Sequence, residues 1–135
     1  MVMGGVMHID EAAEAPVNIR VPADKSQVAM IRAIAETLAV LADFSLDEVA
    51  DIKLAVDEAA MTIIAGASPD AELKVALTAA DQKFHAIIQS WFPVDNTLVQ
   101  QGFGWHVLQT LTSLVAVHEG ETRRNGRLVA IELSK

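Results

Sequence analysis

The sequence predicts an α+β domain, a two-layer α/β sandwich in which a mixed, mainly antiparallel sheet carries its helices on one face. Three observations favour this class. Apolar residues recur every three or four positions in three segments, as in amphipathic helices, and alternate with polar residues elsewhere. The alternating segments succeed one another through short turns, which join antiparallel strands. The chain has 135 residues, 52% of them hydrophobic, which is enough for one core.

The first two predicted elements are a strand and a helix. Val17–Val21 alternates apolar and polar residues, which is typical of a strand, and Pro22 ends it. Asp24 or Ser26 then caps the start of a helix. The apolar face of this helix is formed by residues spaced three or four apart: Val28, Ile31, Ile34, Leu38 and Leu41.

The second helix has the clearest start in the chain. Ser45 and Glu48 form a capping box, and Phe44 and Val49 are placed as a hydrophobic staple. Five apolar residues at helical spacing then mark its buried face: Val49, Ile52, Val56, Ala59 and Ile63. Gly66 ends the helix.

Two strands come next. Glu72–Thr78 alternates apolar with polar or small residues, and Asp81–Lys83 forms the turn to a second strand, Phe84–Trp91. That second strand is apolar on both faces, which predicts a central position in the sheet.

The last third of the chain predicts a helix followed by a hairpin. Gly102–Gly104 opens a third amphipathic helix. The strands Val115–Glu119 and Leu128–Leu133 follow it, and Asn125-Gly126 supplies a tight turn between them.

The composition excludes several kinds of site. A net charge of −8 leaves no broad basic surface for nucleic acid, and we expect the three arginines at the tip of the last hairpin, Arg123, Arg124 and Arg127, to be solvated. Cysteine is absent, which excludes disulfides and thiolate nucleophiles. The four histidines, His8, His85, His106 and His118, lack metal-ligand spacing, so no metal-ligating cluster is expected.

Signals for membranes and secretion are missing as well. No apolar run approaches the ~18 residues of a membrane span. Residues 1–16 lack the basic start and apolar centre of a signal peptide, and we expect a flexible N-terminal tail before one domain of residues 17–135. Together with the absence of cysteine, these features predict a cytoplasmic protein.

The second helix carries a string with a known likeness, D-I-K-L-A-V-D-E-A-A-M-T at residues 51–62. It resembles the N-box of the histidine-kinase-like (GHKL) ATPases, in the variant found in anti-sigma-factor serine kinases. The resemblance matches Glu58 to a glutamate that acts as general base towards a serine hydroxyl, and Thr62 to an asparagine that holds Mg²⁺. The alternative is that Glu58 is a solvated helix carboxylate.

Two more features carry the resemblance, which extends over residues 17–133. Gly102–Trp105 resembles the second glycine box of the family, where glycines let backbone N–H groups approach an anion. This implies that Gly102 and Gly104 contact the nucleotide. Arg32 stands where the family carries an arginine that contacts the sigma factor and its antagonist, a role that suits a guanidinium group. The alternative is a solvated surface arginine.

The sequence departs from the family in the nucleotide-binding boxes. The Asp-x-Gly box, whose aspartate reads the adenine amino group, is replaced by Ser90–Pro93. Asp95 follows and substitutes for it only if the loop is rearranged, while Trp91 is expected in the core rather than stacked on a base. The lid is only residues 92–101, and Thr62 replaces the asparagine, so binding of ATP and Mg²⁺ is expected to be weakened.

The resemblance implies an anti-sigma factor that sequesters a sigma factor, is released by an antagonist protein and forms a homodimer, with ATP and Mg²⁺ as cofactors. Two alternatives stay open. One is an active ATP-dependent serine/threonine kinase that phosphorylates the antagonist, with Asp95 and Thr62 contacting adenine and metal. The other is a pseudo-ATPase interaction module. Neither nucleic acid nor a membrane is an expected partner.

Overall fold

The computed structural model describes residues 16–123 and 126–135. The tail expected at residues 1–16 lies almost entirely outside the described residues, as do Arg124 and Asn125, so what was expected of them stays a prediction. The elements follow the predicted order: β1 (Val17–Pro22), a 3-10 helix η1 (Lys25–Gln27), α2 (Val28–Leu41), α3 (Leu46–Gly66), β2 (Glu72–Ala80), β3 (Lys83–Phe92), α4 (Phe103–Leu111), β4 (Leu114–Arg123) and β5 (Gly126–Ser134).

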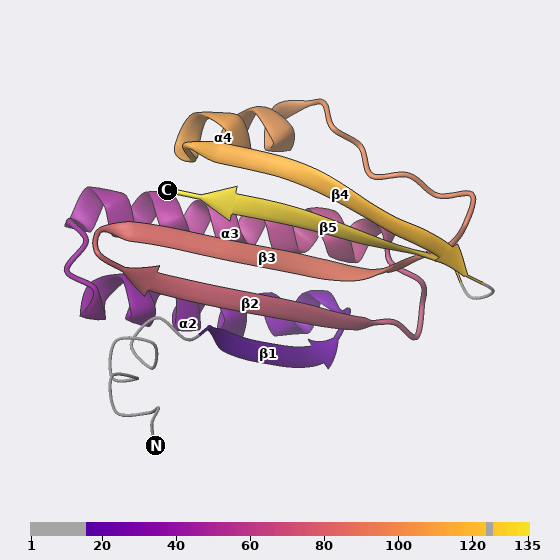
Figure 1. The fold of residues 1–135 in the computed structure, drawn as a ribbon, viewed down its shortest axis with the longest axis horizontal. Coiled ribbons are helices and arrows are strands. Elements are labelled where there is room, and N and C mark those ends of the chain that lie inside the picture. The colour runs from indigo at the N-terminus through magenta and orange to yellow at the C-terminus, as the bar shows by residue number, and fades with distance from the viewer. Residues whose placement is uncertain (1–15, 124–125) are drawn as a thin grey trace, which may run out of the picture.

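The five described strands form one sheet in the order β1-β2-β3-β5-β4 (Figure 1). Each neighbouring pair is antiparallel, so this part of the sheet has none of the parallel pairs that a mixed sheet contains. β3 is the central strand, as predicted. The turn before it uses two residues with positive φ, Asp81 and Gln82, which matches the twist of a tight hairpin.

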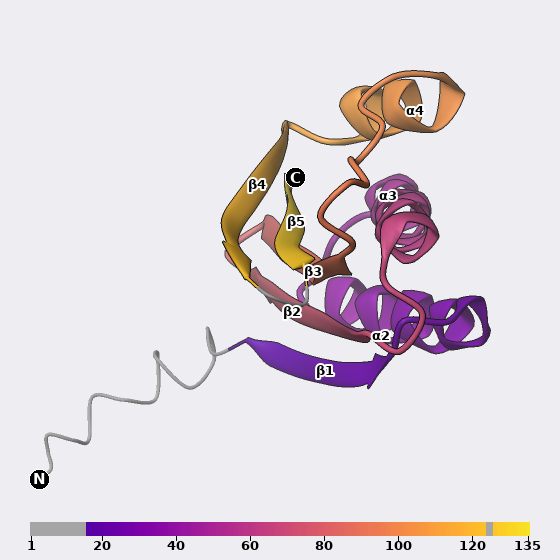
Figure 2. The same cartoon turned by 90° about the vertical axis from the view of Figure 1, so that its right-hand side faces the viewer.

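The helices cover one face of this sheet (Figure 2). α3 lies between α2 and α4 and packs on β3 and β5. Fully buried side chains between the two layers come from α2, α3, α4, β2, β3 and β5, and they include Ile31, Ile52, Val56, Ile63, Leu73, Leu77, Ile88, Phe92, Leu108 and Ile131. The α+β class with helices on one face is therefore confirmed. None of the described helices is long and apolar enough to cross a membrane.

The start of α3 follows the predicted capping box. Oγ of Ser45 accepts from the backbone N–H of Glu48 at 3.2 Å, and Oε1 of Glu48 accepts from the N–H of Ser45 at 2.9 Å. The second of these bonds does most to hold the pKa of Glu48 below its ordinary value. Phe44 and Val49 are both buried, as a hydrophobic staple requires.

The buried face of α2 differs from the predicted one. Ala35 and Ala39 are completely buried, whereas the side chain of Leu41 is 75% exposed. α2 packs against α3 and β2, and the alanines let the helix axes approach closely. Leu41 is the last helical residue, where the chain turns away towards α3. The prediction counted only large apolar residues, and it therefore placed the buried face of α2 at the wrong angle around the helix axis.

Trp91 does not lie in the core, contrary to the prediction. Side chains alternate between the faces of a strand, and its neighbour Phe92 is completely buried on the helix side. Trp91 consequently stands on the outer face of the sheet, where it is half-buried. The guanidinium carbon of Arg123 lies 5.7 Å from the centroid of its ring, a cation–π contact that explains this position.

Candidate functional site

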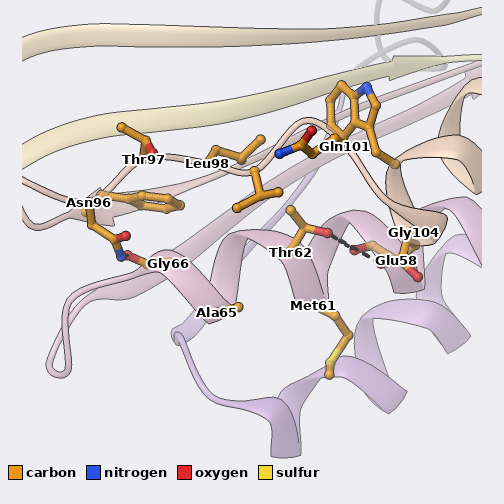
Figure 3. Close-up of a pocket in the computed structure, with 13 residues that line it drawn as sticks. Glu58, Met61, Thr62, Ala65, Gly66, Asn96, Thr97, Leu98, Gln101 and Gly104 are labelled. Atoms are coloured by element: carbon orange, nitrogen blue, oxygen red, sulfur yellow. Dashed lines mark hydrogen bonds between the residues drawn. The ribbon is translucent and has the colours of Figure 1, made fainter.

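A cavity of about 390 Å³ opens between α3, the loop after β3 and the start of α4 (Figure 3). This volume is within the usual range of small-molecule sites. Its lining comes from four segments: Glu58, Met61, Thr62, Ala65 and Gly66 of α3, Phe92 of β3, Asn96, Thr97, Leu98, Val99 and Gln101 of the loop, and Gly104 and Trp105 of α4. Asn96 and Gly66 lie at one end, and Glu58 and Gly104 lie at the other.

The structure brings Glu58 together with Gly104. A β-carbon placed on Gly104 would overlap Oε2 of Glu58 and lie 2.9 Å from its Cδ. A β-carbon at this position would therefore displace the carboxylate, the far end of the flexible Glu58 side chain, from the first turn of α4. That turn also has unpaired N–H groups and a positive dipole end, which favours a carboxylate beside it.

Thr62 lies one turn further along α3 from Glu58. Its Oγ1 donates to the carbonyl oxygen of Glu58 at 2.8 Å, and it lies 3.5 Å from Oε2 of the same residue. The first of these bonds is the usual back-bond of a helical threonine. A carboxylate and a hydroxyl are thus neighbours on the wall of the cavity.

The opposite end of the cavity is built around Asn96. Nδ2 of Asn96 donates to the carbonyl oxygen of Gly66 at 3.0 Å, so this side chain caps the C-terminus of α3. The ring of Phe92 packs against Gly66, where a β-carbon would overlap it. Asn96 and Phe92 therefore form a polar and an aromatic wall next to each other.

Arg127 of β5 holds the loop that carries Asn96. Its Nη1 donates to the carbonyl oxygen of Val94 at 3.1 Å, and its Nη2 donates to that of Asn96. Its Nε lies 2.8 Å from Oε1 of Glu119, an ion pair without hydrogen-bond alignment. The side chain of Arg127 is only 14% exposed, so the expectation that it is solvated is wrong.

Two of the expected nucleotide-binding residues do not line the cavity. Asp95 is exposed on the loop and does not line the cavity, whereas the next residue, Asn96, is also exposed but lines it. Gly102 is the N-cap of α4, with φ of 93°, a conformation that favours glycine. Its part in the site is to start the helix that presents Gly104. The roles proposed for Asp95 and Gly102 stay predictions.

Arg32 lies on the outer side of the helical layer, between α2 and α3. Its Nη1 donates to Oδ1 of Asp57 at 2.7 Å, and both side chains are partly exposed. One turn further along α2, Glu36 forms a similar pair with Lys53 at 3.2 Å. Asp57 orients the guanidinium group, and both the partner-binding role of Arg32 and the alternative of a solvated arginine stay predictions.

Ten of the thirteen lining residues had not been predicted as site residues, and four of them are Met61, Phe92, Asn96 and Trp105. Met61 lies three residues after Glu58 on α3, so the helical period alone would have predicted that both side chains face the cavity. Trp105 lies next to Gly104 and is 9% exposed. Phe92 and Asn96 gave no local signal, since their positions depend on how the loop returns over α3.

The residues present can be compared with the implied cofactors. Mg²⁺ takes oxygen ligands, and the carboxylate of Glu58 with the hydroxyl of Thr62 offers two of them. A triphosphate needs cationic partners, but among the described residues none that lines the cavity is lysine or arginine. The cavity therefore offers two oxygen ligands to a metal, and its described lining offers no cationic side chain to a phosphate chain.

Comparisons with known proteins agree with this architecture. Residues 21–131 match the family model of the histidine kinase-like ATPase domain. The chain is 31% identical, over 107 residues, to the anti-sigma-F factor RsbW of two strains of Mycobacterium tuberculosis. The match covers 77% of this chain and 62% of each relative, so the chain spans less than two thirds of the length of these relatives.

Proposed function

Because the chain belongs to the histidine kinase-like ATPase domain family, we propose that it is an anti-sigma regulator that sequesters a sigma factor in the cytoplasm and is released by an antagonist protein. The observation that carries this proposal is the 31% identity to an anti-sigma-F factor over 107 residues. An acidic chain with net charge −8 suits control of transcription through protein partners rather than through DNA. Homodimer formation stays a prediction.

Arg32 is the residue that we assign to partner binding. A guanidinium group has five N–H donors, and the bond to Asp57 fixes its plane. The side chain remains 42% exposed, so donors are left for a carboxylate of the partner. An arginine that is already oriented loses less entropy on binding than a free one.

The test is direct binding to purified sigma factors of the source organism, measured by titration calorimetry. We expect one sigma factor to bind, and Arg32→Ala to weaken its affinity by about tenfold or more. Arg20→Ala is the matched control, because Arg20 is 64% exposed on β1 and should leave affinity unchanged. Equal effects of the two substitutions, or no binding by any sigma factor, would contradict the proposal.

Serine kinase activity towards the antagonist is the second candidate. It is favoured by the position of Glu58, which lines the cavity and can accept a proton from a hydroxyl group there. In this reading Glu58→Gln abolishes ATP-dependent phosphorylation of the antagonist while sigma-factor binding persists. Phosphorylation that continues unchanged in Glu58→Gln would exclude Glu58 as the base.

A further inference from the structure

A hollow of about 540 Å³ lies on the open face of the sheet, the face that no described helix covers (Figure 2). Its outward-facing side chains come from β1, β2 and β3: Asn18, Arg20, Lys74, Ala76, Ile87 and Gln89. Val75 is buried on the helix side, so its neighbours Lys74 and Ala76 face outwards. Ala76 pairs with Asn18 on β1 and with Ile87 on β3, and its short side chain between these two larger ones leaves the hollow open.

The neighbouring row of side chains in the hollow brings two cations face to face. Arg20 on β1 is the direct cross-strand partner of Lys74 on β2, and Lys74 is that of Gln89 on β3. Like charges directly opposite each other on antiparallel strands destabilise a sheet. Gln89 is uncharged and offsets neither cation, and no ion pair among the described residues includes Lys74.

A carboxylate beside the hollow neutralises this pair only in part. Oε1 of Glu72 lies 3.8 Å from Nε of Arg20, and the side chains are 59% and 64% exposed, so this ion pair contributes little. Two cations and one carboxylate leave one positive charge at the hollow, although the net charge of the chain is −8. A bound anion with a single charge would compensate it and would reduce the repulsion between Arg20 and Lys74.

The charge and the lining of the hollow together define the class of ligand. A guanidinium group binds a carboxylate through two parallel hydrogen bonds, and an ammonium group adds further donors. A carboxylate matches the single positive charge better than a phosphate group, whose charge is about −1.5 to −2. Ala76 and Ile87 offer apolar surface roughly 7 Å along the strands from the cations, which suits the hydrocarbon body of the ligand.

We propose that this hollow is a binding site for a small organic carboxylate with an apolar body. Arg20 and Lys74 hold the carboxylate, and Ala76 and Ile87 contact the apolar body. The hollow lies on the open face of the sheet, whereas Arg32 lies on the helical layer that covers the other face. The inference is therefore independent of the proposed anti-sigma function.

The probe is octanoate, a carboxylate with a straight apolar chain, titrated into the isotope-labelled full chain below the concentration at which it forms micelles. We expect the backbone amide signals of Lys74 and Ala76 to shift and to saturate in NMR spectra. Octanol, which lacks the charge, and inorganic phosphate, which lacks the apolar body, should each bind at least about tenfold more weakly. Added salt should weaken the binding of octanoate, because exposed charges are screened.

Substitutions separate binding from a structural role of the same residues. Lys74→Gln should weaken octanoate about tenfold without lowering the urea concentration at the midpoint of unfolding, since it removes the repulsion from Arg20. Ala76→Leu should fill the hollow and weaken octanoate about tenfold or more. Lys83→Gln is the matched control, because Lys83 is an exposed cation of β3 that does not line the hollow.

Three results would overturn the inference. They are unshifted signals of Lys74 and Ala76 with octanoate, octanol that binds as tightly as octanoate, or equal effects of Lys74→Gln and Lys83→Gln. If Ala76→Leu fails to fold, octanol and phosphate still test the charge and the apolar surface separately. Arg20→Ala should weaken octanoate while sparing sigma-factor binding, so a failure of this inference is distinguishable from a failure of the anti-sigma proposal.

Discussion

At the scale of single residues, the contact between Glu58 and Gly104 joins the two helices that form the site. Gly104 is the second residue of α4, where glycine costs less helix propensity than the ~1 kcal/mol of a helix interior. Its lack of a side chain leaves room for the Glu58 carboxylate. The glycine is thus explained by what packs against it and not by backbone conformation, because its φ is that of an ordinary helical residue.

This contact predicts a coupling between two substitutions. Gly104→Ala alone displaces the carboxylate of Glu58, and this cost offsets the gain in helix propensity. In a Glu58→Ala background the overlap is gone, so Gly104→Ala should be more stabilising there by about 0.5 kcal/mol. Urea denaturation of the four proteins of this cycle measures the coupling. Additive free energies of unfolding would show that the two side groups do not interact.

At the scale of elements, a side chain of the sheet holds the loop at the site, and we call its contacts with the loop the clamp. Arg127 on β5 binds two carbonyl groups of the loop, and Asn96 of the loop in turn caps α3. The loop is short and has no helix or strand of its own, so these contacts define its path.

Arg127→Met should remove the clamp while keeping the apolar stem. Losing hydrogen bonds from a charged donor should lower the free energy of unfolding by about 2 kcal/mol. The backbone amide hydrogen of Asn96 should then exchange faster with solvent. Arg123→Met on the same hairpin is the control, because its cation–π contact with Trp91 is worth less than about 1 kcal/mol at an exposed position. An unchanged exchange rate at Asn96 in Arg127→Met would show that the loop is held by other contacts.

An element could be predicted from the sequence when the residues that determine it are close to one another in the chain. The capping box at Ser45, the buried face of α3 and the tight turn at Asp81 were readable because each depends on a few residues close in sequence. The buried face of α2 was predicted incorrectly because alanines form its close contact. That contact depends on tertiary packing and not on residues close in sequence.

The candidate site was only partly predictable for the same reason. Glu58, Thr62 and Gly104 were identified by a resemblance of local motifs, and they do line one cavity. Asn96 was not identified, because its neighbour Asp95 carried the expected chemical group, and only the course of the loop decides which of the two lines the cavity. No period or motif encodes that choice.

At the scale of the whole molecule, the open face of the sheet contains a charged cluster that should be sensitive to acid. Oε2 of Glu132 on β5 lies 2.7 Å from Nε2 of His85 on β3, and its Oε1 lies 2.8 Å from Nε2 of His118 on β4. The hydrogen bonds from His85 and then His118 hold the pKa of Glu132 below its ordinary value. This carboxylate therefore ties three strands together.

A lowered folded-state pKa stabilises the protein above the unfolded-state pKa, about 4.3 for glutamate, and this stabilisation is lost as the pH falls through the folded-state value. Glu132→Gln should therefore reduce stability near neutral pH by less than about 1 kcal/mol and make it less sensitive to acid below about pH 4.3. Thermal unfolding at several pH values tests this, with Glu72→Gln, an exposed residue 3.8 Å from Arg20, as control. Identical pH profiles for Glu132→Gln and the parent protein would contradict it.

The anti-sigma function is the central claim, and run-off transcription with purified RNA polymerase tests it most directly. The account predicts that the chain, added before the sigma factor meets the core enzyme, abolishes transcription that depends on one sigma factor and spares transcription that depends on another. Arg32→Ala should lose this inhibition, and Arg20→Ala should retain it. Undiminished transcription with every sigma factor at a large excess of the chain would contradict the claim.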